Sequence, residues 1–73
     1  MNEDTYRRWL EAQHDRDDPI GDLSTDVLGD PLLKGRELTP ESLYEYLSRR
    51  GASHAVLNAA KEAALEYGVE IEH

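Results

Sequence analysis

The chain has 73 residues, a formal net charge of −8 and no cysteine. This length suits one domain, which must be stable without disulfides and cannot hold zinc through cysteine. The charge disfavours nucleic acid and anionic membrane surfaces as partners, and no apolar run could span a bilayer. The N-terminus lacks the apolar stretch of a signal peptide, so we expect a cytoplasmic protein with one domain over 1–73.

Apolar residues recur at helical spacing, and capping residues divide them into four expected helices. The first runs from Thr5 to about Gln13 and begins at a cap provided by Asp4 or Thr5. One face of this helix carries Tyr6, Trp9, Leu10 and Gln13. We expect Trp9 to anchor the core, because aromatic side chains dominate small cores.

The second expected helix begins at Pro19, with Asp18 as its cap, and stops at Gly29. Its apolar stripe comprises Ile20, Leu23, Val27 and Leu28. Gly21 lies in the first turn, where its flexibility costs stability, so it predicts the close approach of another helix. The linker over 30–38 carries Leu32, Leu33 and Leu38, which we expect to fold back over the core around one short turn.

The third expected helix opens with a Thr39 cap and Pro40 at its first position, and it ends at Gly51. Its inner face carries Leu43, Tyr46 and Leu47. Tyr44 lies off this face and is therefore expected to be an exposed aromatic residue.

The fourth expected helix follows a Ser53 cap and ends at Gly68. Its inner stripe comprises Val56, Leu57, Ala60, Ala64 and Tyr67, with Ala63 beside it. The alanines raise helix propensity and permit close packing. The result is an all-α fold, a compact bundle of four short helices with a core of about 5–68 and a frayed tail over 69–73.

An acidic run passes along the second helix, through Asp15, Asp17, Asp18, Asp22, Asp26 and Asp30. It does not fit a calcium-binding EF-hand loop, because Pro19, Ile20 and Asp26 stand where that loop needs an oxygen ligand, a glycine and a glutamate. No metal site is predicted. Asp22 and Asp26 are one helical turn apart and share a face, where like charges mildly destabilise a helix, so they are candidate contacts for a partner.

No motif predicts an enzyme or a bound cofactor. The histidines, His14, His54 and His73, form no metal-binding pair, and nucleophile-elbow and phosphate-loop patterns are missing. The basic doublets Arg7-Arg8 and Arg49-Arg50 both lie beside aromatic residues. Tyr and Arg are enriched at protein interfaces, so Tyr44, Arg49 and Arg50 complete the candidate interaction residues.

The chain resembles the bacterial YozE family over most of its length, from about Tyr6 to Tyr67. The resemblance rests on Tyr6-x-x-Trp9-Leu10, on the block Asp15-Arg16-Asp17-Asp18-Pro19-Ile20-Gly21-Asp22-Leu23, and on Asp26, Asp30-Pro31, Tyr44-x-Tyr46-Leu47, Gly51-Ala52 and Ala63-Ala64-x-x-Tyr67. It implies a four-helix fold like the sterile alpha motif and a bacterial or phage source. The family has no assigned activity, and the acidic block, as its signature, is expected to hold the first two helices together.

The leading hypothesis is a protein-interaction module whose partner is unknown and could be a second copy of the chain. It predicts an exposed aromatic or apolar patch near Tyr44 or Leu65. The alternatives are nucleic-acid binding through Arg49, Arg50 and the start of the fourth helix, and an acidic decoy that occupies a basic site on another protein. The decoy requires the acidic residues to cluster on one face.

Overall fold

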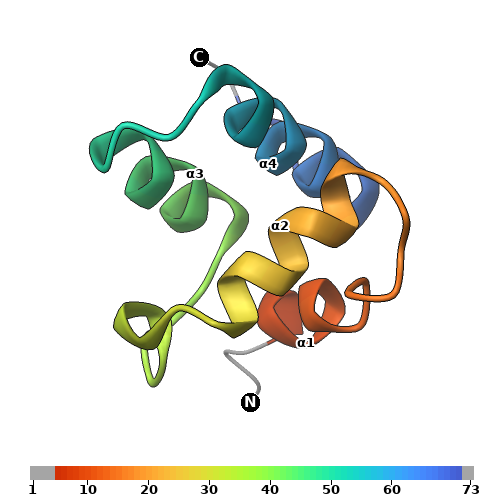
Figure 1. Cartoon of the computed structure of the whole chain (residues 1–73), viewed down its shortest axis with the longest axis horizontal. Coiled ribbons are helices and arrows are strands. Elements are labelled where there is room, and N and C mark those ends of the chain that lie inside the picture. Colours follow the sequence, from red (N-terminus) through yellow and green to blue (C-terminus); the bar gives the residue numbers. More distant parts are fainter. Residues whose placement is uncertain (1–4, 72–73) are drawn as a thin grey trace.

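The computed structural model of the chain, which describes residues 5–71, is built from helices alone over that range. Its elements are α1 (Thr5–Glu11), α2 (Pro19–Leu28), the short 3-10 helix η1 (Pro31–Leu33), α3 (Pro40–Arg49) and α4 (His54–Tyr67). In Figure 1, α2 crosses the middle of the molecule, with α1 at one of its ends and α3 and α4 packed as a pair. The expected all-α bundle of four short helices is confirmed.

The caps predicted for the second, third and fourth helices each begin their helix. The Asp18 carboxylate accepts a hydrogen bond from the amide of Gly21, and the Ser53 hydroxyl accepts one from Val56. Thr39 and Ser42 exchange hydrogen bonds between side chain and backbone in a capping box at the start of α3. The left-handed backbone at Gly68, with φ of 114°, ends α4 as predicted.

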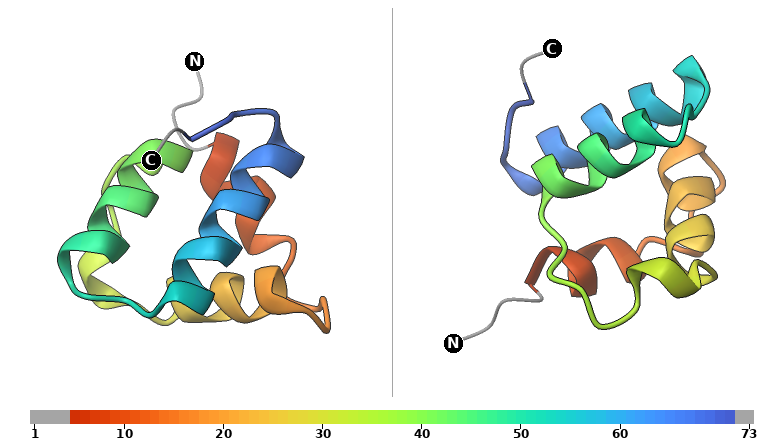
Figure 2. Two further views of the ribbon diagram at one scale, coloured as in Figure 1. Left: turned by 90° about the horizontal axis from the view of Figure 1, so that it is seen from above. Right: turned by 90° about the vertical axis from the view of Figure 1, so that its left-hand side faces the viewer.

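The core lies where the four helices and the linker meet. It is formed by Tyr6, Leu10, Ile20, Leu23, Val27, Leu33, Leu38, Leu43, Tyr44, Leu47, Ala59, Ala60 and Ala63, with Ala64 also buried. Both α2 and α3 pack against α4, and Figure 2 shows this arrangement of the ribbons from two further sides. The small side chains of the buried alanines of α4 leave room for this packing. Trp9 is half-buried at the edge of this core and stacks on Tyr6, with ring centroids 5.9 Å apart.

Several predictions about single residues were wrong. Tyr44 is 8 % exposed, because α3 turns that side toward α4, where the Lys61 ammonium lies 5.8 Å from the ring centroid. Leu28 is 41 % exposed and Leu32 is 65 % exposed, since α2 ends and η1 turns before either side chain reaches the core.

Other corrections concern the ends of the chain. The first helix ends at Glu11, after which residues 12–15 form turns, and Thr5 lies inside it; the alternative cap, Asp4, is outside the described residues. The start of the tail is held in place, because the Val69 amide donates to the Ala64 carbonyl at 2.8 Å and Ile71 packs against the core. Residues 72–73 are outside the described range. Over residues 5–71, no helix has the length and apolar character needed to cross a bilayer.

Candidate functional site

The first part of the acidic block builds the corner between α1 and α2. The loop backbone comes so close to α2 that a Cβ atom at Gly21 would lie 1.9 Å from the Arg16 carbonyl oxygen. A close approach at Gly21 was expected from a helix, and it is made instead by this loop. The Asp18 carboxylate caps α2 and also accepts two hydrogen bonds from the Arg16 guanidinium, at 3.0 and 2.8 Å. Asp18 is therefore a structural residue.

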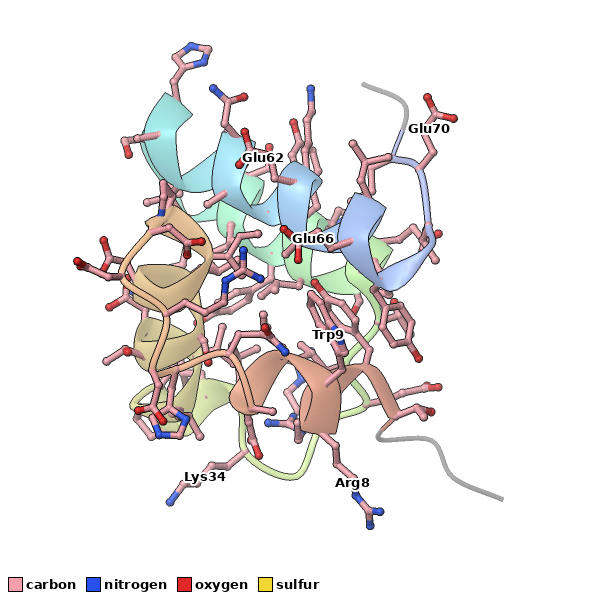
Figure 3. All side chains as sticks on the ribbon, turned by 90° about the vertical axis from the view of Figure 1, so that its right-hand side faces the viewer. Arg8, Trp9, Lys34, Glu62, Glu66 and Glu70 are labelled. Atoms are coloured by element: carbon pink, nitrogen blue, oxygen red, sulfur yellow. The ribbon has the colours of Figure 1, made fainter. Side chains whose placement is uncertain are left out.

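Arg16 also joins this corner to α4. Its guanidinium donates to both carboxylate oxygens of Glu66, at 2.8 and 3.0 Å, across 50 positions of sequence. The hydrogen bonds from Arg16 hold the pKa of Glu66 below its ordinary value, and the Gly21 amide and Arg16 together lower the pKa of Asp18. Figure 3 shows Glu66 on α4 above Trp9 of α1, in the seam that this arginine helps to close.

A second structural cluster forms where α2 ends. The Asp30 carboxylate accepts hydrogen bonds from the Leu32 amide at 2.9 Å, the Tyr46 hydroxyl at 2.8 Å and the Arg50 guanidinium at 2.7 Å. These hydrogen bonds hold the pKa of Asp30 below its ordinary value, with that from Tyr46 as the largest cause. The Arg50 guanidinium also lies over the Tyr46 ring, 5.3 Å from its centroid. Asp30 thus fastens η1 and the end of α3 to the end of α2.

Between these two corners, a groove runs along α2. It consists of two adjoining hollows, of about 400 Å³ and about 180 Å³, which share Leu23, Asp26 and Val56 as lining residues. The larger hollow is completed by Val27, Gly29, Asp30, Pro31, Leu33, Leu47, Arg50 and Ala52, and the smaller by Pro19, Asp22, Ala55 and Ala59. The groove therefore has α2 along one side and the α3–α4 corner along the other. The lining of the smaller hollow is mainly apolar, and that of the larger hollow is about half polar.

The predicted acidic pair lies on this groove. Asp22 and Asp26 are both exposed, and neither carboxylate has an ion pair or hydrogen bond within residues 5–71. The structure also brings Arg50 to the groove, but its guanidinium is engaged by Asp30. The rim consequently presents unpaired negative charge beside the apolar lining of the smaller hollow.

The remaining candidate residues do not join this site. Tyr44 is buried against α4, so it cannot be the exposed interface aromatic that the sequence predicted. The side chain of Arg49 is 79 % exposed and comes no closer than 4.0 Å to Glu45 on the same helix. Leu65 is 59 % exposed as predicted, on α4 and outside both hollows.

The Tyr6 hydroxyl is a buried polar group with no hydrogen-bond partner within the described part of the chain. Burial raises its pKa to about 12, and the nearby charge of Glu41 adds to the effect. A neutral phenol enclosed by Trp9 and Tyr67 is suited to packing. Over the described range, no three His, Asp or Glu side chains come together as a metal-binding group.

The sequence indicated the rim of the groove but not its lining. Asp22 and Asp26 were recognisable from their spacing, whereas Ala55 and Pro19 had only the features of a helix start. One feature of the sequence could have indicated the structural role of Arg16, because it is a single basic residue inside an acidic run. Comparison of the chain with protein families, with curated proteins and with solved structures finds no match.

Proposed function

We propose that the protein is a protein-binding module that uses the groove along α2, and that it is not an enzyme. The observation that carries this proposal is the pairing of exposed apolar surface, most complete in the smaller hollow, with the unpaired carboxylates of Asp22 and Asp26 on its rim. Apolar surface gains free energy when a partner covers it, and charges at the edge select which partner can do so. Val56 is half-buried and lines both hollows, so part of its apolar side chain remains exposed to solvent, where a partner could bury it.

The groove supports protein binding better than it supports nucleic-acid binding. A phosphate would have to displace Asp30 from Arg50 and would then face Asp26 on the same groove. At this corner the Arg50 guanidinium is already paired with Asp30, which leaves Arg49 as a single exposed base, and one base is little for a surface that must neutralise phosphates. An acidic decoy has limited support too, because Asp18, Asp30 and Glu66 are engaged within the chain.

We also propose membership of the YozE-like family. What supports it is the structural use of the residues on which the resemblance rests: Arg16 and Asp18 fasten α2, and Gly21 admits the loop. That use matches the role expected of the family's acidic block.

Site-specific photo-crosslinking in the source cells tests the proposed function. A benzophenone amino acid at Ala55, inside the groove, should give a covalent adduct with a discrete partner protein. The matched control is the same amino acid at Asn58, which is exposed on the same helix and lines neither hollow. Equal adducts from both positions, or none from Ala55, would contradict the proposal.

A further inference from the structure

The proposed function leaves open what kind of segment the groove takes, and the geometry of the groove bears on this. The lining follows α2 from Pro19 at its first position to Pro31 just beyond its end. A helix of ten residues is about 15 Å long at the rise of an α-helix. The groove therefore offers a strip about three helical turns in length, and a partner segment of similar length would cover it.

The walls of the groove determine the backbone of that segment. Within the described residues the groove is lined by helices and their connections, and no strand edge is present. An extended peptide leaves backbone amides and carbonyls that are usually paired by a strand edge, and the groove has no such edge within the described residues. A helix satisfies its own backbone groups, so it can be laid on such a strip without that cost.

The rim determines the charge of the segment. Asp22 and Asp26 share an edge of α2 and are four residues apart, a rise of about 6 Å along the helix. Two Lys or Arg side chains one turn apart on a second helix have the same spacing. Their long stems can lie over the edge of the apolar strip while their charged ends reach the carboxylates.

From these features we infer that the groove binds an amphipathic α-helix of a partner protein, about three turns long, with two basic residues one turn apart beside its apolar stripe. A second copy of this chain does not provide that helix. Its net charge of −8 opposes self-docking, and no α-helix within residues 5–71 carries two bases three or four positions apart. The inference rests on the proposed function and names the partner's chemistry.

Titration with designed peptides tests this assignment. The probes are acetylated and amidated helical peptides of about four turns with a leucine stripe, as a panel that places two lysines four residues apart in each register beside the stripe. Backbone amide shifts of the isotope-labelled protein report the site and the affinity. At least one register should shift residues along the groove, including Leu23, Val27 and Val56, while its glutamate counterpart binds at least tenfold more weakly.

Variants of the protein separate specific pairing from general attraction. Replacing both rim acids, Asp22→Asn with Asp26→Asn, should weaken the best lysine peptide about three- to tenfold at low salt. The control Glu37→Gln removes an exposed acid of the linker, outside both hollows, and should change the affinity less than twofold.

Several results would overturn the inference. These are the absence of shifts with every register, equal binding of the glutamate peptides, equal binding of a lysine peptide whose leucines are replaced by serine, or an unchanged affinity in the double rim variant. If any of these is found while crosslinking at Ala55 still yields a discrete partner, the groove binds protein of another chemistry and the proposed function stands. If crosslinking at Ala55 also fails, both the inference and the proposed function are contradicted.

Discussion

The acidic run divides into two parts that the fold treats differently. Asp18 and Asp30 are engaged within the chain, each by backbone and side-chain donors, and both have a lowered pKa. Asp22 and Asp26 lie between them in sequence and have no such partner within the described residues. Within one run of like residues, Asp18 and Asp30 thus hold the ends of α2 to neighbouring elements, while Asp22 and Asp26 between them face the groove.

This difference follows from the helix between them. Asp18 precedes α2 and Asp30 follows it, so both lie at ends, where unpaired amides and neighbouring elements are within reach. Asp22 and Asp26 lie inside α2, where the backbone groups pair with each other and the side chains extend to solvent. Breaking the first part should therefore cost stability, and changing the second should cost binding.

The largest loss of stability is expected from Gly21→Ala. The new Cβ would overlap the backbone carbonyl of Arg16, so the corner held by Asp18 must shift. We expect the free energy of unfolding to fall by about 3 kcal/mol, which for a domain of this size lowers the melting temperature by more than about 10 °C. Thermal unfolding followed by circular dichroism measures the change.

Gly29→Ala is the matched control for that substitution. Gly29 ends α2 with φ of −90°, and a Cβ there would meet nothing closer than 3.6 Å. Its stability should stay within about 0.5 kcal/mol of the wild type. Equal effects of the two substitutions would show that the loop does not press on α2.

The next largest effect on stability is expected from replacing Arg16, and it depends on pH. The folded-state pKa values of Glu66 and Asp18 lie below their ordinary values of 4.5 and 3.8. The two carboxylates therefore contribute their full stability above the ordinary pKa values, and they lose it as the pH falls from these values through the lower folded-state pKa values. Arg16→Met should lower the melting temperature by several degrees at neutral pH. The variant should then lose less stability than the wild type between about pH 6 and about pH 3.

Arg8→Met removes the same charge from an exposed arginine of α1, which Figure 3 shows pointing away from the body of the protein. Melting curves of this control should follow the wild type at every pH. Parallel acid dependence in the Arg16 variant and the wild type would show that the pairs with Glu66 and Asp18 do not stabilise the fold.

A smaller effect is expected at the other structural end of the run. Tyr46→Phe removes the hydroxyl that donates to Asp30 and accepts from Arg50, while it keeps the ring. The melting temperature should fall by a few degrees, because Asp30 retains its contacts with Arg50 and the Leu32 amide. Tyr67→Phe, in which the half-buried ring also remains, is the control and should change stability less.

The contrast between the two ends and the middle also explains what the sequence could predict. The caps at Asp18, Thr39 and Ser53 depend on atoms within three residues, so local sequence was sufficient to identify them. The environment of Tyr44 depends on how far α3 is rotated against α4. A helical pattern does not specify that rotation when apolar residues lie on both sides of the assumed face.

The groove was only partly predictable for the same reason. The rim acids share one helix, and their spacing placed them together. The lining requires the start of α4 to lie beside α2, and the Asp30–Arg50 pair spans 20 positions of sequence. Contacts of that separation are set by packing of the whole bundle, so no local pattern indicated that Arg50 would be engaged by an acid.

The smallest expected effect on stability is at the rim itself, and it is the sharpest test of the division. Asp26→Asn removes repulsion from Asp22 and a negative charge from the C-terminal half of α2, where the helix dipole disfavours it. Asp22→Asn relieves the same repulsion but removes a charge that the dipole favours in the first turn. Asp26→Asn should be neutral or stabilising and Asp22→Asn slightly destabilising, each within about 0.5 kcal/mol.

Chemical denaturation at low and high salt resolves such differences, and screening by salt should shrink both changes in stability. A clear loss of stability from Asp26→Asn would mean that this carboxylate belongs with Asp18 and Asp30 as a structural group, and the middle of the run would no longer be free to meet a partner.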